Sequence, residues 1–153
     1  MAGFFVFLEF FLSTSDRLIR DLLSERILIL DGAMGTMIQG HGLDSHHFHG
    51  DDFHGHACDQ TGNNDILTLT QPELIRGIHS KYLEAGSDII ETNTFNSNSV
   101  SMADYGLESQ VLRLNESAAR LAKEVAAEWS KKTPNKPRFV AGVLGPTNAT
   151  ASI

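Results

Sequence analysis

The order of apolar and polar positions predicts helices that alternate with strands. Residues 15–25 place four apolar side chains on one face of a short helix, namely Leu18, Ile19, Leu22 and Leu23. The next run, ILILD at 27–31, is apolar up to its closing aspartate, which is typical of a strand buried on both faces of a parallel sheet. Residues 40–65 show no period, so we interpret them as a long loop.

A second helix is predicted from Thr70, which can cap it, with Glu73 three residues later completing a capping box. Gly86 is a natural end for this helix, and a second strand follows at 88–91. The predicted buried stripe of the helix consists of Leu74, Ile75, Ile78, Tyr82 and Leu83.

The clearest helical period runs over residues 107–129, and Pro134 prevents its continuation. A third apolar strand is predicted at 138–146. Strands that alternate with helices indicate an α/β fold with a parallel sheet, and open sheets and (β/α)8 barrels both begin in this way.

Three polar segments follow the three predicted strands: DGAMGT at 31–36, ETNTFNSNS at 91–99 and GPTNAT at 145–150. In parallel α/β proteins the carboxyl ends of the strands are where ligands bind. Three such segments on one rim therefore predict a site for a small polar ligand.

Each residue of this rim has a functional and a purely structural interpretation. Asp31 can hold an ammonium group or cap a helix that begins near Met34, while Gly32 can offer its N–H to a carboxylate or serve as a turn glycine. Glu91 can bind ligand or orient neighbouring backbone N–H groups. The same choice between pocket lining and turn chemistry applies to Asn93, Thr94, Phe95, Thr147 and Asn148.

Composition excludes several other classes of protein. A net charge of -7 argues against nucleic acid and anionic membrane surfaces as partners. The single cysteine, Cys58, excludes an intrachain disulfide and a zinc site of several cysteines within this chain. The apolar run at 4–12 is shorter than a membrane span, so we interpret residues 1–14 as an extra arm before a domain at 15–153.

Six histidines lie between His41 and His56, a composition that can bind zinc, nickel or copper. The segment lacks a helix-spaced pair such as H-E-x-x-H, so a solvated loop is the favoured interpretation and a metal-binding module the alternative. A dinucleotide loop is disfavoured because the glycines near Gly32 do not complete G-x-G-x-x-G.

Four segments resemble, in order, the N-terminal module of cobalamin-dependent methionine synthases, within the homocysteine S-methyltransferase family. They are RILILDGAMGTMIQ at 26–39, GNNDILTLTQPELI at 62–75, AGSDIIETNTFNSNSVSMADYGLE at 85–108 and RFVAGVLGPTNATASI at 138–153. The GNND and MADYGLE segments favour methionine synthase within the family. Two positions depart from the common pattern: Ala33 replaces the second glycine of DGGMGT, and Ala149 replaces the arginine of Asn-Arg-Thr.

The resemblance implies a (β/α)8 TIM barrel, of which this chain would supply about three βα units. In that family the rim binds homocysteine, so Asp31 and Gly32 would hold its amino-acid end and residues 91–95 would complete the wall. A zinc ion on three cysteine thiolates would bind the homocysteine sulfur, but those cysteines belong to segments beyond Ile153. Methylcobalamin on a separate module would donate the methyl group, and methyltetrahydrofolate on a folate module would replenish it.

We therefore expect the homocysteine-binding portion of a cytoplasmic methyltransferase that produces methionine, with no activity in this chain alone. One alternative is another homocysteine S-methyltransferase that uses a different methyl donor. The other is a truncated product without catalytic function.

Overall fold

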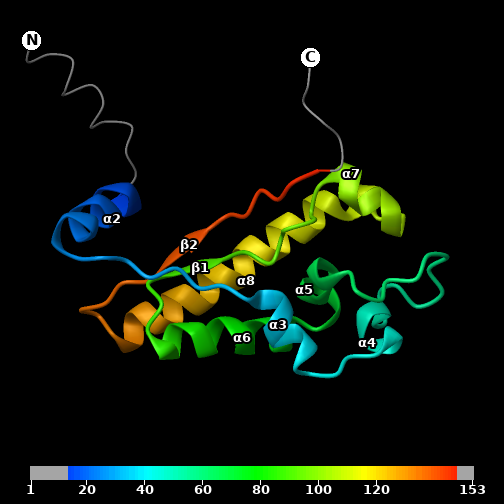
Figure 1. The fold of residues 1–153 in the computed structure, drawn as a ribbon, viewed down its shortest axis with the longest axis horizontal. Coiled ribbons are helices and arrows are strands. Elements are labelled where there is room, and N and C mark those ends of the chain that lie inside the picture. The colour runs from blue at the N-terminus through cyan, green and yellow to red at the C-terminus, as the bar shows by residue number, and fades with distance from the viewer. Residues whose placement is uncertain (1–13, 148–153) are drawn as a thin grey trace, which may run out of the picture.

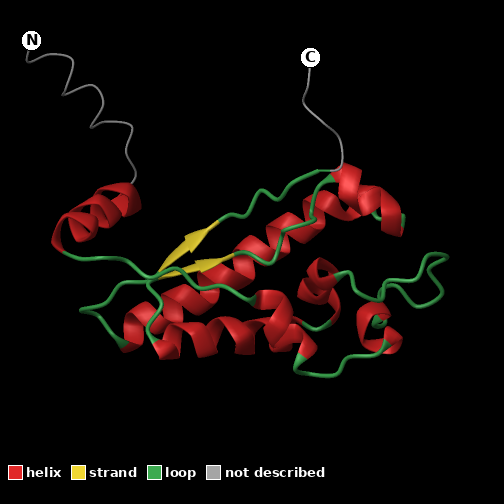
Figure 2. Ribbon diagram, viewed as in Figure 1, coloured by secondary structure: helices red, strands yellow, loops and turns green. Residues whose placement is uncertain are grey.

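A computed structural model describes residues 14–147 as an α/β fold that is rich in helix and contains a small parallel sheet (Figure 2). Residues 1–13 of the predicted arm and Asn148 lie outside the described residues. The longer elements are α2 (Thr14–Glu25), α6 (Pro72–Ala85), β1 (Ile89–Glu91), α8 (Val111–Lys132) and β2 (Phe139–Ala141). The shorter ones are α3 (Met34–Gln39), α4 (Ser45–His49), η1 (Asn64–Ile66), α5 (Leu67–Thr70), α7 (Ser99–Met102), η2 (Ala103–Tyr105) and η3 (Glu108–Gln110).

The sheet brings three segments of the chain side by side with the same direction. β1 pairs with β2 in parallel, with Ile90 opposite Val140, and Leu30 forms an isolated parallel bridge to Ile89 on the other side. α8 makes the crossover between the two strands and packs against α6 alongside the sheet (Figure 1). The described residues thus form parallel βα units, and a closed barrel is not among them.

The segment at 27–31 was predicted as a strand buried on both faces, and this is wrong for the described structure. Only Leu30 bridges to β1, while Ile27 and Ile29 are 86% and 56% exposed. The backbone still runs along β1, because Asp31 N donates to Ile89 O at 2.9 Å and Ile89 N donates to Ile29 O at 3.1 Å. The side chains are exposed because no described element covers this edge of the sheet.

The second predicted helix is present, but it begins differently from the predicted capping box. Thr70 ends α5, its hydroxyl donates to Ile66 O, and α6 starts at Pro72 without a side-chain cap. Proline suits this first position because it has no N–H to leave unpaired. At the other end Gly86 has φ 114°, a left-handed conformation that favours glycine, so the predicted helix end is confirmed.

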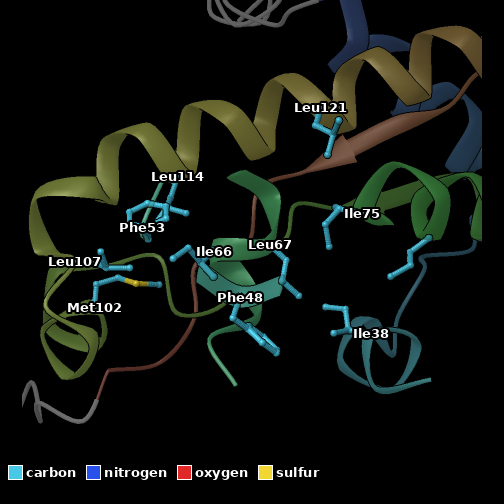
Figure 3. Close-up of a cluster of buried hydrophobic side chains, with 11 residues drawn as sticks. Ile38, Phe48, Phe53, Ile66, Leu67, Ile75, Met102, Leu107, Leu114 and Leu121 are labelled. Atoms are coloured by element: carbon cyan, nitrogen blue, oxygen red, sulfur yellow. The ribbon is translucent and has the colours of Figure 1, made fainter. Parts of the chain in front are cut away.

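The main core lies between α6, α8 and the shorter helices. Side chains from α3, α4, α5, α6 and α8 converge there (Figure 3). Ile75 and Ile78 of the predicted stripe are fully buried in it, whereas Leu74 and Tyr82 pack at its margin. The third helix begins at Val111 rather than at 107, and Leu107 is buried in the turn before it.

Residues 40–65 are more ordered than the predicted long loop. α4 lies within them, and its N-cap Asp44 forms a reciprocal capping box with His47. Phe48 and Phe53 are buried in the core, at 6% and 7% exposure. Two aromatic anchors, too widely spaced to give a helical period, fold this segment onto α5 and α8.

Between residues 14 and 147, no helix combines the length and the apolar character that crossing a membrane requires.

Candidate functional site

A pocket of about 300 Å³ lies where the segment at 27–31 and β1 end. Its walls come from the turn at 31–35, from Asn64 and Asp65, from the segment 91–96 and from Val143. Six of the predicted site residues line it together: Asp31, Gly32, Glu91, Asn93, Thr94 and Phe95. The structure thus brings these side chains into one place, while their role in binding stays a prediction.

Asp31 is held in the wall of this pocket by the neighbouring strand. Its Oδ1 accepts the Glu91 N–H at 2.9 Å, and its own N–H joins the ladder to Ile89. The alternative that Asp31 caps the following helix is wrong, because the N-cap of α3 is Ala33, without a side-chain cap. Burial raises the pKa of Asp31 to about 6, and the nearby negative charge of Glu91 also raises this pKa, while the Glu91 N–H opposes the shift.

The turn after Asp31 contains a strained residue. Ala33 has φ 46° and ψ 34°, the left-handed conformation that alanine rarely adopts. This is the position where the resembling family carries glycine. The turn therefore keeps the shape that glycine would allow, at a cost in backbone free energy.

The two threonines after β1 are framework residues as well as pocket residues. The hydroxyls of Thr92 and Thr94 lie 2.7 Å apart, and Thr94 Oγ1 donates to Val143 O at 3.0 Å. Val143 N in turn donates to Thr92 Oγ1 at 3.0 Å. The ends of β1 and β2 are thus tied together by side chains, beyond the point where the backbone ladder stops.

Asn93 ties the same segment to the other wall of the pocket. Its side-chain amide donates to Asn64 O at 2.8 Å and lies 3.3 Å from Thr68 Oγ1. Phe95, by contrast, is 56% exposed at the mouth of the pocket. Asn93 and Thr94 therefore shape the pocket through buried hydrogen bonds, whereas the Phe95 ring remains accessible to a ligand.

Asp65 is a pocket residue that the sequence did not indicate. It is 2% exposed, and its Oδ2 accepts the Asn96 N–H at 2.7 Å and the Ser97 hydroxyl at 2.8 Å. Burial raises the pKa of Asp65. The available signal was the GNND segment, which contains Asn64 and Asp65 but was interpreted as part of a loop.

Thr147 does not join the Asp31 pocket. It lines a separate hollow with Asp104 and Tyr105. The chain reaches that hollow because Gly145 lies against the Phe95 carbonyl, where a β-carbon would overlap the oxygen. Only glycine fits this close approach.

The charges around the pocket are all negative. Asp31, Asp65 and Glu91 line it, and among residues 14–147 no lysine, arginine or histidine does. A ligand that enters with a positive group therefore gains attraction from three carboxyl groups, whereas an anionic group meets repulsion. The arrangement is suited to an ammonium group.

The residues described do not fit the zinc site that the resemblance implies. Within residues 14–147, no group of three or more His, Cys, Asp or Glu side chains is placed to hold a metal ion. Cys58 is absent from the pocket wall and lies with His56 near Gly106. In the histidine-rich segment His47 pairs with Asp44 at 2.6 Å, a contact already used in capping α4.

The sequence profile of the homocysteine S-methyltransferase family matches residues 28–153. The chain belongs to this family. The match confirms the family-level resemblance, which rested on the same segments. Every residue that lines the pocket, from Asp31 to Val143, lies within the matched residues.

Three crystal structures of the homocysteine methyltransferase MmuM from Escherichia coli are similar to this chain. The metallated form superposes with a TM-score of 0.64 at 25% identity, over 84% of this chain and 41% of that one. The oxidized form gives 0.64 at 28% identity, over 84% and 40%. The apo form gives 0.60 at 26% identity, over 88% and 42%. The chain thus spans about two fifths of these relatives' length.

Proposed function

We propose that this chain is the homocysteine-binding portion of a homocysteine S-methyltransferase. The observation that carries the proposal is the pocket at the strand ends, where Asp31 is anchored by Glu91 N–H and faces a space lined by carboxyl groups. Family membership supplies the substrate class, since the MmuM structures are those of a homocysteine methyltransferase. The complete enzyme would close these units into a (β/α)8 barrel.

In this proposal Asp31 and Glu91 hold the ammonium group of homocysteine, and Phe95 contacts its methylene chain. Asp65 acts through the backbone of Asn96, which it fixes at the rim. Thr94 keeps the end of β1 against Val143, so the pocket keeps its shape when empty. A preformed site spends less binding free energy on ordering its own side chains.

Methyl transfer requires the homocysteine sulfur as a thiolate. The described residues provide no cation beside the pocket to stabilise a thiolate, and they do not fit a zinc site, so we assign them substrate binding and no step of sulfur activation. The methionine synthase resemblance also implies a zinc ion, a cobalamin module and a folate module. We propose these for a complete enzyme and not for this chain alone. We also propose a cytoplasmic location, because the methionine synthase resemblance implies one.

Calorimetric titration with L-homocysteine tests the proposal. Wild-type chain should bind it, and Asp31→Ala should weaken binding by about 10-fold, because a desolvated ammonium–carboxylate contact contributes roughly 1.5 kcal/mol or more. Asp21→Asn, an exposed position on α2, removes a negative charge away from the pocket and serves as the control. Binding that survives Asp31→Ala unchanged would refute the assignment.

The pH dependence of binding gives an independent reading of the same residue. Asp31 has a pKa raised to about 6, so its carboxylate becomes protonated as the pH falls through that value. Homocysteine affinity should therefore decline between pH 7 and pH 5 in wild type. In Asp31→Asn the affinity should be low throughout and lack this decline.

A further inference from the structure

A cluster of basic side chains lies at the end of the sheet where the strands begin, away from the pocket at the strand ends. Asp88 and Arg138 immediately precede β1 and β2, and the last turn of α8 lies beside them (Figure 1). Charge is unevenly distributed along the sequence: all 19 acidic residues lie at or before Glu128, whereas four of the 12 basic residues follow it, within residues 131–138. Positive charge is therefore concentrated at one end of a protein whose net charge is -7.

The buried carboxylate of Asp88 holds two of these cations in place. Arg26 donates to its two oxygens at 2.7 and 2.9 Å, and Lys136 Nζ lies 3.8 Å from it. Arg138 donates to the carbonyl of the preceding residue, Ser87. The side chain of Asp88 is fully buried, whereas those of Arg26 and Lys136 are 37% and 35% exposed, so the cations and not the carboxylate face the solvent.

The ring of Trp129 is the aromatic part of this cluster. Lys132 Nζ lies 4.7 Å from the ring centroid and Arg138 Cζ lies 5.9 Å from it, and both distances are within the range of cation–π contacts. Trp129 is half-buried and Lys132 is exposed. The ring thus connects Lys132 to the cations around Asp88. We call the four cations the basic corner: Arg26, Lys132, Lys136 and Arg138.

The basic corner carries more positive charge than the nearby carboxylates offset. Asp88 and Glu25 both attract Arg26, and Asp88 also attracts Lys136 and Arg138, so two carboxylates face four cations. Burial lowers the pKa of Arg138, and repulsion from Arg26 lowers this pKa further, while Asp88 opposes the shift. The cations are thus close enough to repel one another, and an external anion relieves this repulsion.

We infer that the basic corner is a docking surface for an acidic segment of a partner protein. Carboxylates of the segment pair with the surplus cations, as arginine clusters recognise acidic motifs, and an apolar side chain of the segment packs against the Trp129 ring. The inference is independent of the function proposed above. Docking at the beginning of the strands also leaves the homocysteine pocket open, because that pocket lies where the strands end.

The net charge of the chain favours this partner over other polyanions. At -7 the protein repels nucleic acid and anionic membranes, whose charges extend over many Debye lengths. A short acidic segment carries few charges and lies within one Debye length of the corner, roughly 8 Å at physiological salt. Local attraction to the basic corner therefore exceeds the screened repulsion from the rest of the protein.

Fluorescence of Trp129 reports binding at the corner directly, because it is the only tryptophan in the chain. Hexaglutamate is titrated against the full chain with selective excitation of tryptophan, and hexaglutamine is the neutral comparison. Hexaglutamate should change the fluorescence in a saturable way, whereas hexaglutamine should not. Raising NaCl from about 0.05 M to about 0.5 M should weaken hexaglutamate binding about 10-fold, because salt screens exposed charges.

Substitutions of exposed lysines test the location, with affinity taken from the midpoint of each titration. Lys132→Gln should weaken hexaglutamate binding about 3-fold, the effect of one exposed ion pair, whereas Lys132→Arg should retain it. Combining Lys131→Gln with Lys132→Gln should weaken binding about 10-fold. Arg120→Gln is the matched control, since it removes one positive charge at an exposed position of α8 about two and a half turns before Trp129, and it should retain wild-type affinity.

Four results would overturn the proposal. One is an equal response to hexaglutamate and hexaglutamine, or an affinity that the double lysine variant leaves intact. Another is an equal loss of affinity in Arg120→Gln, which would reflect net charge alone. The third is the same response to free glutamate at equal carboxylate concentration, which would show an adventitious ion only. The last is tighter binding of a uridine hexanucleotide or of phosphatidylserine vesicles than of hexaglutamate, which would replace the acidic protein segment by nucleic acid or membrane.

Discussion

His79 should make the stability of this protein depend on pH between 7 and 5. The residue lies on α6, is 1% exposed, and has no hydrogen-bond partner for either ring nitrogen among the described residues. Burial lowers the pKa of His79 to about 4 from its ordinary 6.5. In the unfolded chain the ring takes up a proton as the pH falls through 6.5, but in the folded protein it does so only near pH 4.

The sign follows from the protons bound in each state. Between these two pKa values the unfolded state binds more protons, so the stability of the folded state falls as the pH falls. The lowered pKa of His79 reduces the free energy of unfolding by roughly 3 kcal/mol when the pH is below both pKa values. At pH 5 the loss already amounts to about 2 kcal/mol, while at pH 7 it is close to zero.

Two substitutions separate the effect of charge from the effect of packing. His79→Leu removes both the titration and the unpartnered nitrogens, so it should raise the free energy of unfolding at pH 7 by about 1 kcal/mol and by about 3 kcal/mol at pH 5. His79→Gln removes the titration but keeps an unpartnered polar group. It should share the flatter pH dependence of His79→Leu without the gain at pH 7.

Urea denaturation followed by circular dichroism at pH 7, 6 and 5 measures these differences. Contributions from other titrating groups are common to all three proteins, and they cancel when each variant is compared with wild type at the same pH. If His79→Leu loses as much stability as wild type between pH 7 and pH 5, the reasoning from burial fails.

Three further predictions concern the site and the base of the sheet. Ala33→Gly should raise the free energy of unfolding by about 1 kcal/mol in a urea titration, because it relieves the left-handed conformation of that residue; an unchanged midpoint would contradict this. Asp65→Ala should lower the free energy of unfolding by about 2–3 kcal/mol in the same urea titration, since it leaves the Asn96 N–H and the Ser97 hydroxyl unpaired. Asp65→Asn should lower it less, because an amide oxygen can still accept one of these hydrogen bonds. Asp88, fully buried and bound by Arg26 at 2.7 and 2.9 Å, has a lowered pKa, so its stabilising contribution should be present at neutral pH and disappear as the pH falls below the ordinary value of 3.8. In Asp88→Asn, thermal melts should show a lower midpoint at pH 7 and a smaller acid-induced drop than in wild type.

Local periodicity predicted the helices well. α2, α6 and most of α8 lie where apolar residues recur every three or four positions, and Gly86 ends α6 as expected. The segment at 27–31 was predicted less well, because apolar residues show that a strand prefers burial but not whether a neighbour is present to cover it. No element within residues 14–147 covers its side chains.

The site was predicted in outline and missed in detail for a related reason. The polar residues that follow the predicted strands indicated that Asp31 and Glu91 lie together, because the ends of parallel strands meet at one rim. Both residues do line the same pocket. Asp65 is fixed by hydrogen bonds to residues about thirty positions away, and no local pattern records such contacts. Thr147 follows a strand end as expected, yet the path of the chain after Gly145 takes it into the neighbouring hollow.

The hydrogen bond from Asp31 to Ile89 also bears on how the chain is made. The two residues are roughly 60 positions apart, so at a synthesis rate of about 5–20 residues per second the apolar segment at 27–31 has no partner for roughly 3–12 s. Throughout that interval four consecutive apolar side chains, Ile27 to Leu30, are presented to other nascent chains. The segment that positions the proposed ligand anchor is therefore also a segment that waits for its partner strand during translation.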